Sequence, residues 1–241
     1  MTLEQLVIRV LDCASLKSVR DFADSFKDLH VKLDGLVLNA GSICTSLELT
    51  EDGIERMFQV NYLSQFALVN DLMSSLAVSA SIVSVTSAAH FYSAPLGLDL
   101  SSINDPRIFD TWRTYGRSKL ACLMMIKQLT RRLGPESLVI ANAVHPGFVA
   151  GHFTQGFLPN SPFFNALVGT LQSCLAWSPE TAALTVLNVS DGQSRHRGGY
   201  WVPVARLATP SILSCDEEAT TQLWNFSQKL LEGKGHQCPE V

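Results

Sequence analysis

With 241 residues, 46% of them hydrophobic and 17% charged, the chain is a core-rich globular protein of about one domain, not a disordered one. The net charge of −4, without a Lys/Arg run longer than Arg131-Arg132, excludes a basic nucleic-acid surface. No signal peptide is recognisable at the start, and the apolar stretch at 163–177 is too short and too polar to span a bilayer. We therefore expect a cytoplasmic protein without a membrane anchor. The six cysteines are scattered, so neither a metal site nor a disulfide framework is expected.

Short apolar runs alternate with longer amphipathic stretches, which predicts βα units and a mostly parallel sheet. Strands are expected at residues 6–11, 36–38, 82–85, 137–144 and 198–202. The strand at 36–38 is entirely apolar, as expected of a strand covered on both faces. No repeat, low-complexity tract or linker divides the chain, so a single domain over residues 1–241 is predicted.

Helix boundaries follow from capping residues and breakers. A first helix is expected after Ser15, a second over about 50–77, and a third carries Tyr115 and ends before Gly134. A loop at 145–162 leads to two helices, the second of which begins at Ser178 with proline in the next position. A capping box that starts at Ser214 begins a final helix, which ends near residue 233.

Tyr115 and Lys119 are four residues apart in the third predicted helix and therefore share one face of it. An ammonium group close to a phenol lowers the pKa of the phenol. A tyrosine tuned in this way can exchange a proton with an alcohol oxygen near neutral pH. The same spacing also occurs on ordinary half-exposed helix faces, so these two residues alone leave both interpretations open.

Polar and glycine-containing segments follow three of the predicted strands directly. They are Asn39-Ala40-Gly41, Thr86-Ser87 and His145-Pro146-Gly147. Ligands bind at the carboxyl ends of strands in open α/β sheets, so we expect these segments to lie around one site. Asn61 lies among the apolar residues Phe58, Val60, Leu63 and Phe66 of the second predicted helix.

The order of these motifs, with Tyr115-x-x-Ser118-Lys119 among them, resembles the short-chain dehydrogenase/reductase family over nearly the whole chain. Within the family, the chain is most similar to the branch of retinol dehydrogenases and WW domain-containing oxidoreductases. The segments behind this resemblance include those at 52–61, 113–120, 142–147 and 198–200. The resemblance implies a Rossmann-like, doubly wound α/β fold with a mostly parallel sheet.

The resemblance also implies an NAD(P)-dependent oxidoreductase that acts on the CH–OH or carbonyl group of a lipophilic alcohol, retinoid or steroid. Tyr115 would be the general acid/base, and Lys119 would lower its pKa and bind the nicotinamide ribose. Ser87 would hold the substrate oxygen, and Asn61 would hold a water in a proton relay. Homodimers are usual in the family.

On the cofactor side, Asp12 would accept a hydrogen bond from the adenine amino group, and the segment 39–41 would line the adenosine. The full set implied for cofactor binding is Asp12, Asn39, Ala40, Gly41, Tyr115, Lys119, Pro146, Gly147 and Val149.

Structural alternatives remain open for several of these residues. Ser87 could cap a strand end, Asn61 could satisfy helix backbone groups, and Asp12 could cap the first helix. His145 and His90 are expected to be structural, and the region of Trp112 and Tyr92 is expected to shape a substrate pocket.

One family motif is missing from these 241 residues: the T-G-x-x-x-G-x-G loop whose helix N-terminus holds the pyrophosphate. We therefore expect a fold that is incomplete at its N-terminal βαβ unit, and NAD or NADP binding that is weak or lost. The strand at 36–38 would then have an unpaired edge. Two alternatives are open for the strand at 6–11: it pairs with this edge, or it remains unpaired. The alternative hypothesis is a truncated, catalytically silent isoform or fragment that acts at most as an interaction partner. A serine hydrolase fits poorly, because no G-x-S-x-G elbow is present.

Overall fold

The computed structural model describes residues 6–93, 97–149, 176–191 and 196–236. Its sheet has five strands in the order β1-β2-β3-β4-β5; the first four are parallel, and the last pairs antiparallel with β4. The strands are β1 Leu33–Leu38, β2 Leu76–Val85, β3 Ile140–Val144, β4 Tyr200–Val202 and β5 Arg206–Ala208. The helices include α1 Leu16–Lys27, α2 Arg56–Phe58, the π-helical η2 Gln59–Leu63, α3 Ser64–Leu72, α4 His90–Ser93, α5 Thr111–Leu133, α7 Pro179–Ser190 and α8 Glu217–Gly233. The short 3-10 helices are η3 Met73–Ser75, η5 Leu100–Ser102 and η7 Ile212–Cys215. The predicted Rossmann-like sheet, mostly parallel and flanked by helices, is confirmed.

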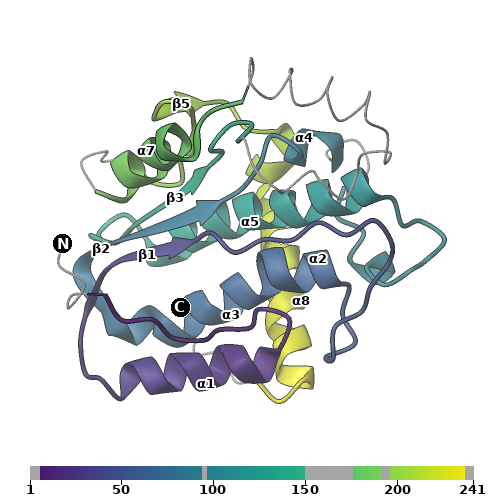
Figure 1. Ribbon diagram of the computed structural model, residues 1–241, viewed down its shortest axis with the longest axis horizontal. Helices are drawn as coiled ribbons and strands as arrows, with labels where there is room; N and C mark the ends of the chain where they lie inside the picture. Colours follow the sequence, from purple (N-terminus) through teal and green to yellow (C-terminus); the bar gives the residue numbers. More distant parts are fainter. Residues whose placement is uncertain (1–5, 94–96, 150–175, 192–195, 237–241) are drawn as a thin grey trace.

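The helices cover the two faces of the sheet unequally (Figure 1). Helices α3 and α5 lie on one side, with α1 packed against α3 and α8 against α5. The main core lies on this side and contains Tyr62, Phe66, Leu123, Met124 and Trp224. On the other side, α7 packs against β2 and β3 over a smaller cluster of Val83, Val144, Val189 and Trp201. No helix among the described residues is long and apolar enough to cross a membrane.

The predicted strand at 6–11 is wrong. Residues 6–12 form no regular structure, and the side chains of Val7, Ile8 and Val10 are exposed. β-branched residues favour a strand only where a neighbouring strand offers hydrogen bonds and a packed face. Within the described part of the chain, β1 pairs only with β2, so its outer edge is bare.

Burial of β1 on both faces was also expected and is wrong. Leu38 is buried, but Val37 on the opposite face is 45% exposed. That face of the sheet is the one that carries α7, which packs mainly against β2 and β3. An apolar sequence therefore did not guarantee a covered strand.

Local turn geometry explains the other shifted boundaries. The helix expected from residue 50 begins at Arg56, because Gly53 with φ +71° turns the chain before it. It ends at η3, and β2 already begins at Leu76. The final helix is capped by Asp216, which accepts from the Ala219 N–H at 3.0 Å, and not by Ser214.

Three predicted helix ends are confirmed. Ser15 caps α1 and accepts from the Ser18 N–H. Helix α5 ends at Gly134, which has φ +70°. Ser178 caps α7, with Pro179 in the first turn. The first of the two helices expected after the loop at 145–162 lies outside the described residues.

Candidate active site

The carboxyl ends of β1, β2 and β3 and one face of α5 enclose a cavity of about 660 Å³. Cavities of about 300–1,000 Å³ are typical of small-molecule and cofactor sites. The residues predicted from the sequence that line it are Asn39, Ala40, Gly41, Ser87, Tyr115, Lys119, Pro146, Gly147 and Val149. Of the two residues expected to shape a substrate pocket, Trp112 also lines it, whereas Tyr92 is exposed and lines neither this cavity nor the second one described below. The fold therefore brings segments that are far apart in the sequence to one place.

Helix α5 carries two of these side chains and lies close against α4. Asp110 caps α5 by accepting from the Arg113 N–H at 2.8 Å. A Cβ atom added at Gly116 would lie 2.6 Å from the Ala89 backbone oxygen. Only glycine permits so close an approach, and it brings the segment after Ser87 against the turn of α5 that carries Tyr115.

The amine of Lys119 is buried, with 3% of the residue exposed. Its Nζ donates to the Val85 backbone oxygen at 2.9 Å and lies 5.9 Å from the centroid of the Tyr115 ring. Burial lowers the pKa of Lys119. A Cβ atom at Gly41 would lie 3.3 Å from this Nζ, so the glycine leaves room beside the amine.

Tyr115 is a buried phenol at the cavity wall. Burial raises its pKa to about 12, and a hydrogen bond with the Ser87 side chain lowers it by less. The lowered pKa expected from Lys119 is not found in this geometry, because burial is the largest influence on the phenol. At neutral pH the phenol is therefore protonated and can donate a proton.

Asn61 lies within the π-helical segment η2, a type of helix distortion that is frequent at functional sites. Its side-chain amide is fully used: Nδ2 donates to the Ser42 oxygen at 2.9 Å and to Ser118 Oγ at 2.8 Å, and Oδ1 accepts from the Ser42 N–H at 2.6 Å. Its backbone oxygen accepts from Cys122 Sγ at 2.9 Å. These bonds give Asn61 a structural role that ties the loop after Gly41 to α5. Its role in holding a water stays a prediction.

The ring of His90 contacts the backbone of Ser87 and of Ser211. Its Nδ1 lies 2.6 Å from the Ser87 backbone oxygen, and its Nε2 accepts from the Ser211 N–H at 3.2 Å. A carbonyl oxygen only accepts, so the proton is on Nδ1. Burial lowers the pKa of His90, which keeps this ring neutral.

Two predicted site residues, Asp12 and Asn61, are not among the lining residues of the cavity. Asp12 lies on the segment before α1. It is exposed, and its Oδ1 accepts from the Ala14 N–H at 2.8 Å in a local turn. Because Ser15 caps α1, the capping alternative for Asp12 is wrong as well.

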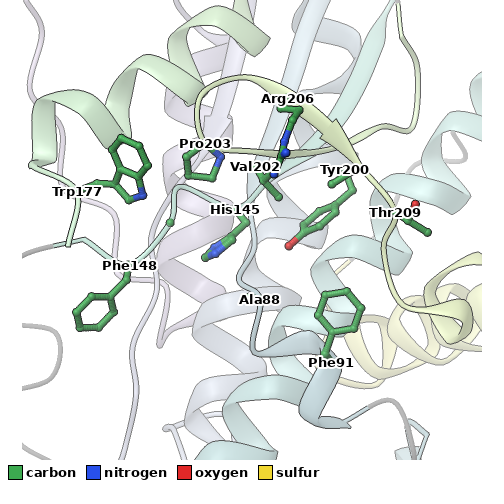
Figure 2. A pocket seen from close by; sticks show the side chains of 12 residues that line it. Ala88, Phe91, His145, Phe148, Trp177, Tyr200, Val202, Pro203, Arg206 and Thr209 are labelled. Atoms are coloured by element: carbon green, nitrogen blue, oxygen red, sulfur yellow. The ribbon is translucent and has the colours of Figure 1, made fainter. Parts of the chain in front are cut away.

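A second cavity, of about 500 Å³, shares part of its lining with the first. Figure 2 shows the side chains that line it. Ala88, His145, Gly147 and Phe148 line both. Burial, together with repulsion from His90, lowers the pKa of His145 to about 4, so its ring is uncharged at neutral pH. The rest of this wall comes from Phe91, Trp177, Tyr200, Val202, Pro203, Arg206, Ala208 and Thr209.

The sequence did not identify the side chains of this second cavity as functional. Tyr200 follows Gly198 and Gly199 on a short strand, and that position at a strand end was the available signal. The antiparallel strand β5, which carries Arg206, was not predicted, because three residues are too few to show a periodic pattern.

The model of the short chain dehydrogenase family matches residues 2–160. The chain is 34% identical to the short-chain dehydrogenase TIC 32 A, chloroplastic, of Brassica napus, covering 92% of this chain and 71% of the relative. It is 34% identical to human retinol dehydrogenase 13, covering 97% and 70%, respectively. It is 35% identical to the human WW domain-containing oxidoreductase, covering 92% and 54%.

Among solved structures, an uncharacterised protein from Mycobacterium paratuberculosis matches 98% of this chain and 78% of its own, with a TM-score of 0.73 and 28% identity. A short-chain dehydrogenase from Burkholderia cenocepacia, solved with NADP, matches 80% and 72%, with a TM-score of 0.56. At 24% identity, the second likeness shows the fold alone. From the family match and the relatives, the chain belongs to the short-chain dehydrogenase/reductase family, in the branch of retinol dehydrogenases and WW domain-containing oxidoreductases.

Proposed function

We propose that this chain is an NAD(P)-dependent alcohol/ketone oxidoreductase. The observation that carries this proposal is the single cavity that Ser87, Tyr115 and Lys119 share with the segments 39–41 and 146–149. A nicotinamide dinucleotide bound there would supply or accept the hydride, and the chain itself would position the substrate and move the proton.

In the reducing direction, protonated Tyr115 gives its proton to the carbonyl oxygen as the carbon is reduced. The oxidising direction is the reverse step and requires the phenolate, which becomes more abundant as the pH rises toward the raised pKa of Tyr115. Ser87 holds the same oxygen, and its hydrogen bond with Tyr115 supports this role. Lys119 places a buried amine beside Tyr115, where it can donate hydrogen bonds to a bound group.

The residues beside the reacting groups fit such a cofactor. Gly41 leaves space next to Lys119, where a Cβ atom would lie 3.3 Å from Nζ. Gly147 has φ +90°, and a Cβ atom there would lie 2.6 Å from Trp177 Cδ1. Asn39, Ala40 and Gly41 would face the adenosine, and Pro146, Gly147 and Val149 the nicotinamide.

The lining also supports a lipophilic alcohol, retinoid or steroid as the substrate. Ala88, Ala89, Trp112 and Phe148 give the cavity an apolar wall near the reacting groups. One relative carries the name retinol dehydrogenase 13. A cytoplasmic location and a homodimer are part of the same proposal; fractionation and sedimentation would test them.

The decisive variant is Tyr115→Phe, which removes only the hydroxyl. The purified chain is expected to change the fluorescence of reduced nicotinamide on binding and to turn over a retinoid or steroid alcohol. In Tyr115→Phe, turnover should fall to background while the change in fluorescence persists. Tyr92→Phe makes the same chemical change at a residue that is 72% exposed, and should alter neither. Turnover that survives in Tyr115→Phe would refute the assigned role.

One observation favours a second candidate function, a catalytically silent interaction partner. The 241 residues contain no T-G-x-x-x-G-x-G loop for the pyrophosphate. Each charge-assisted hydrogen bond from such a loop is worth roughly 1.5–3 kcal/mol, so two or three fewer would weaken binding by several orders of magnitude. Calorimetry with NADP separates the two candidates: micromolar binding supports the oxidoreductase and excludes the silent partner.

A further inference from the structure

Tyr200 places a hydroxyl in the second cavity. The residue is 3% exposed, and its hydroxyl points into the cavity, toward the side where His145 lies (Figure 2). Within the described part of the chain, its hydroxyl makes no hydrogen bond. A hydroxyl that faces a cavity and makes no hydrogen bond within the described part of the chain is available to a ligand atom.

The hydroxyl acts as a donor. Burial raises the pKa of Tyr200 to about 12, so the phenol keeps its proton throughout the neutral range. A ligand oxygen that accepts a hydrogen bond, such as a ketone or ether oxygen or an alcohol, is therefore its natural partner.

The ring of Tyr200 has little freedom to move away from this position. It lies on β4 between Ala143 of β3 and Ala208 of β5. The His90 ring meets it edge-to-face, with centroids 5.0 Å apart. His90 in turn bonds the Ser87 backbone oxygen at 2.6 Å, so one imidazole links the Tyr200 ring to the serine of the first cavity.

The two cavities together suit a ligand that is apolar in the middle and polar at both ends. They meet at Ala88, His145, Gly147 and Phe148. Beyond this junction, the wall of the second cavity is mostly apolar, and it includes the rings of Phe91 and Trp177. Arg206, an exposed residue, is the one charged side chain among its lining residues, and it disfavours a cationic ligand.

We propose that Tyr200 donates a hydrogen bond to a second substrate oxygen, remote from the reacting carbon. This inference rests on the proposed function, because it places the reacting end of the substrate beside Ser87 and Tyr115. The chain then prefers apolar, ring-containing ketones or alcohols with two oxygen functions over compounds of the same skeleton with one.

The test compares two ligands on the full chain: 5α-androstane-3,17-dione and 5α-androstan-3-one. They share one skeleton and differ in the second oxygen. Affinity is measured by calorimetry and by the fluorescence of tryptophan, since Trp177 lines the second cavity. We expect the dione to bind about tenfold more tightly, the value of one well-formed hydrogen bond.

Tyr200→Phe should bring the two affinities to within about twofold of each other by weakening only the dione. Tyr92→Phe should leave the tenfold preference intact. Equal binding of both ligands by the unmodified chain, binding of neither, or a preference that survives in Tyr200→Phe would overturn the inference. This experiment measures binding, so its result does not depend on turnover. Absence of turnover would count against the proposed function, whereas absence of the preference for the dione would count against the role of Tyr200. Circular dichroism of Tyr200→Phe identical to that of the parent confirms that the fold is kept.

Discussion

Three side chains around the cavities, those of Tyr115, His90 and His145, are uncharged at neutral pH because burial penalises their charged forms. Lys119, in contrast, is a buried amine held by the Val85 backbone oxygen. The site therefore combines neutral donors with one buried amine. Such an arrangement favours reactions in which negative charge develops on an oxygen.

The low pKa of His145 predicts a loss of stability in acid. Its pKa is about 4 in the folded chain and about 6.5 in an unfolded one, so the unfolded chain binds more protons between these values. The free energy of unfolding should therefore fall as the pH drops through this window, by about 3 kcal/mol at pH 4. Urea unfolding across the window measures the effect. His145→Gln should flatten the profile, and His30→Gln, at an exposed position, should not. A profile that stays equally steep in His145→Gln would assign the acid sensitivity to other groups.

Among individual residues, the sequence predicted those that proton transfer itself requires. Ser87, Tyr115 and Lys119 were recognised from their order and do line one cavity. The role of Tyr200 was not predicted, because it depends on the contact between β4 and α4. The bond from His90 to Ser87 is local, but it forms at the start of α4, and no helix was expected there. Asp12 was placed at the site only by resemblance, and the segment that carries it joins no strand.

At the scale of elements, the contact between α4 and α5 decides how Ser87 meets Tyr115. Gly116→Ala should weaken this contact, because the new Cβ atom would lie 2.6 Å from the Ala89 oxygen, a backbone atom that cannot rotate away. We expect the free energy of unfolding to fall by about 1–3 kcal/mol, as in other overpacked sites. Urea unfolding checks the value.

Gly233→Ala is the matched control for this prediction. It makes the same change at the end of α8, where nothing lies within 4 Å of the added Cβ atom. Stability should stay the same or rise slightly, since alanine restricts the unfolded chain. Equal losses in the two variants would contradict the close-contact explanation.

Helix ends that depend on the capping residue itself were predicted well. A strand that depends on a partner elsewhere in the chain was not. Ser15, Gly134 and Ser178 mark helix ends because their own conformations and side chains satisfy the helix. The segment at 6–11 has the composition of a strand, but a strand also needs a partner, and the sequence of the segment does not show whether one is present. The turn at Gly53 likewise moved a helix start that amphipathic periodicity alone placed at residue 50.

At the scale of the whole molecule, the sheet exposes apolar side chains on its less covered face. Val37 on β1 is exposed there, and in the described residues β1 has no neighbour on its outer edge. Unprotected edges and apolar patches promote association. We expect the chain to self-associate with rising concentration in sedimentation velocity, and Val37→Lys to shift the distribution toward the monomer.

Ile212→Lys is the control for Val37→Lys. Ile212 is 92% exposed in η7, away from the sheet edge, and a charge there should not change the distribution. A similar shift in both variants would mean that added charge alone, and not the edge, limits association.

The position of β1 at the rim of the sheet also sets the order in which the molecule loosens. Asn39, Ala40 and Gly41 follow this rim strand, whereas Ser87 follows β2, which is paired on both sides. In hydrogen exchange, the amides of β1 should therefore exchange faster than those of β2 at 82–85. In mild denaturant, the part of the cavity formed by Asn39, Ala40 and Gly41 should therefore lose its structure first. The part that carries Ser87 should still be folded at that point.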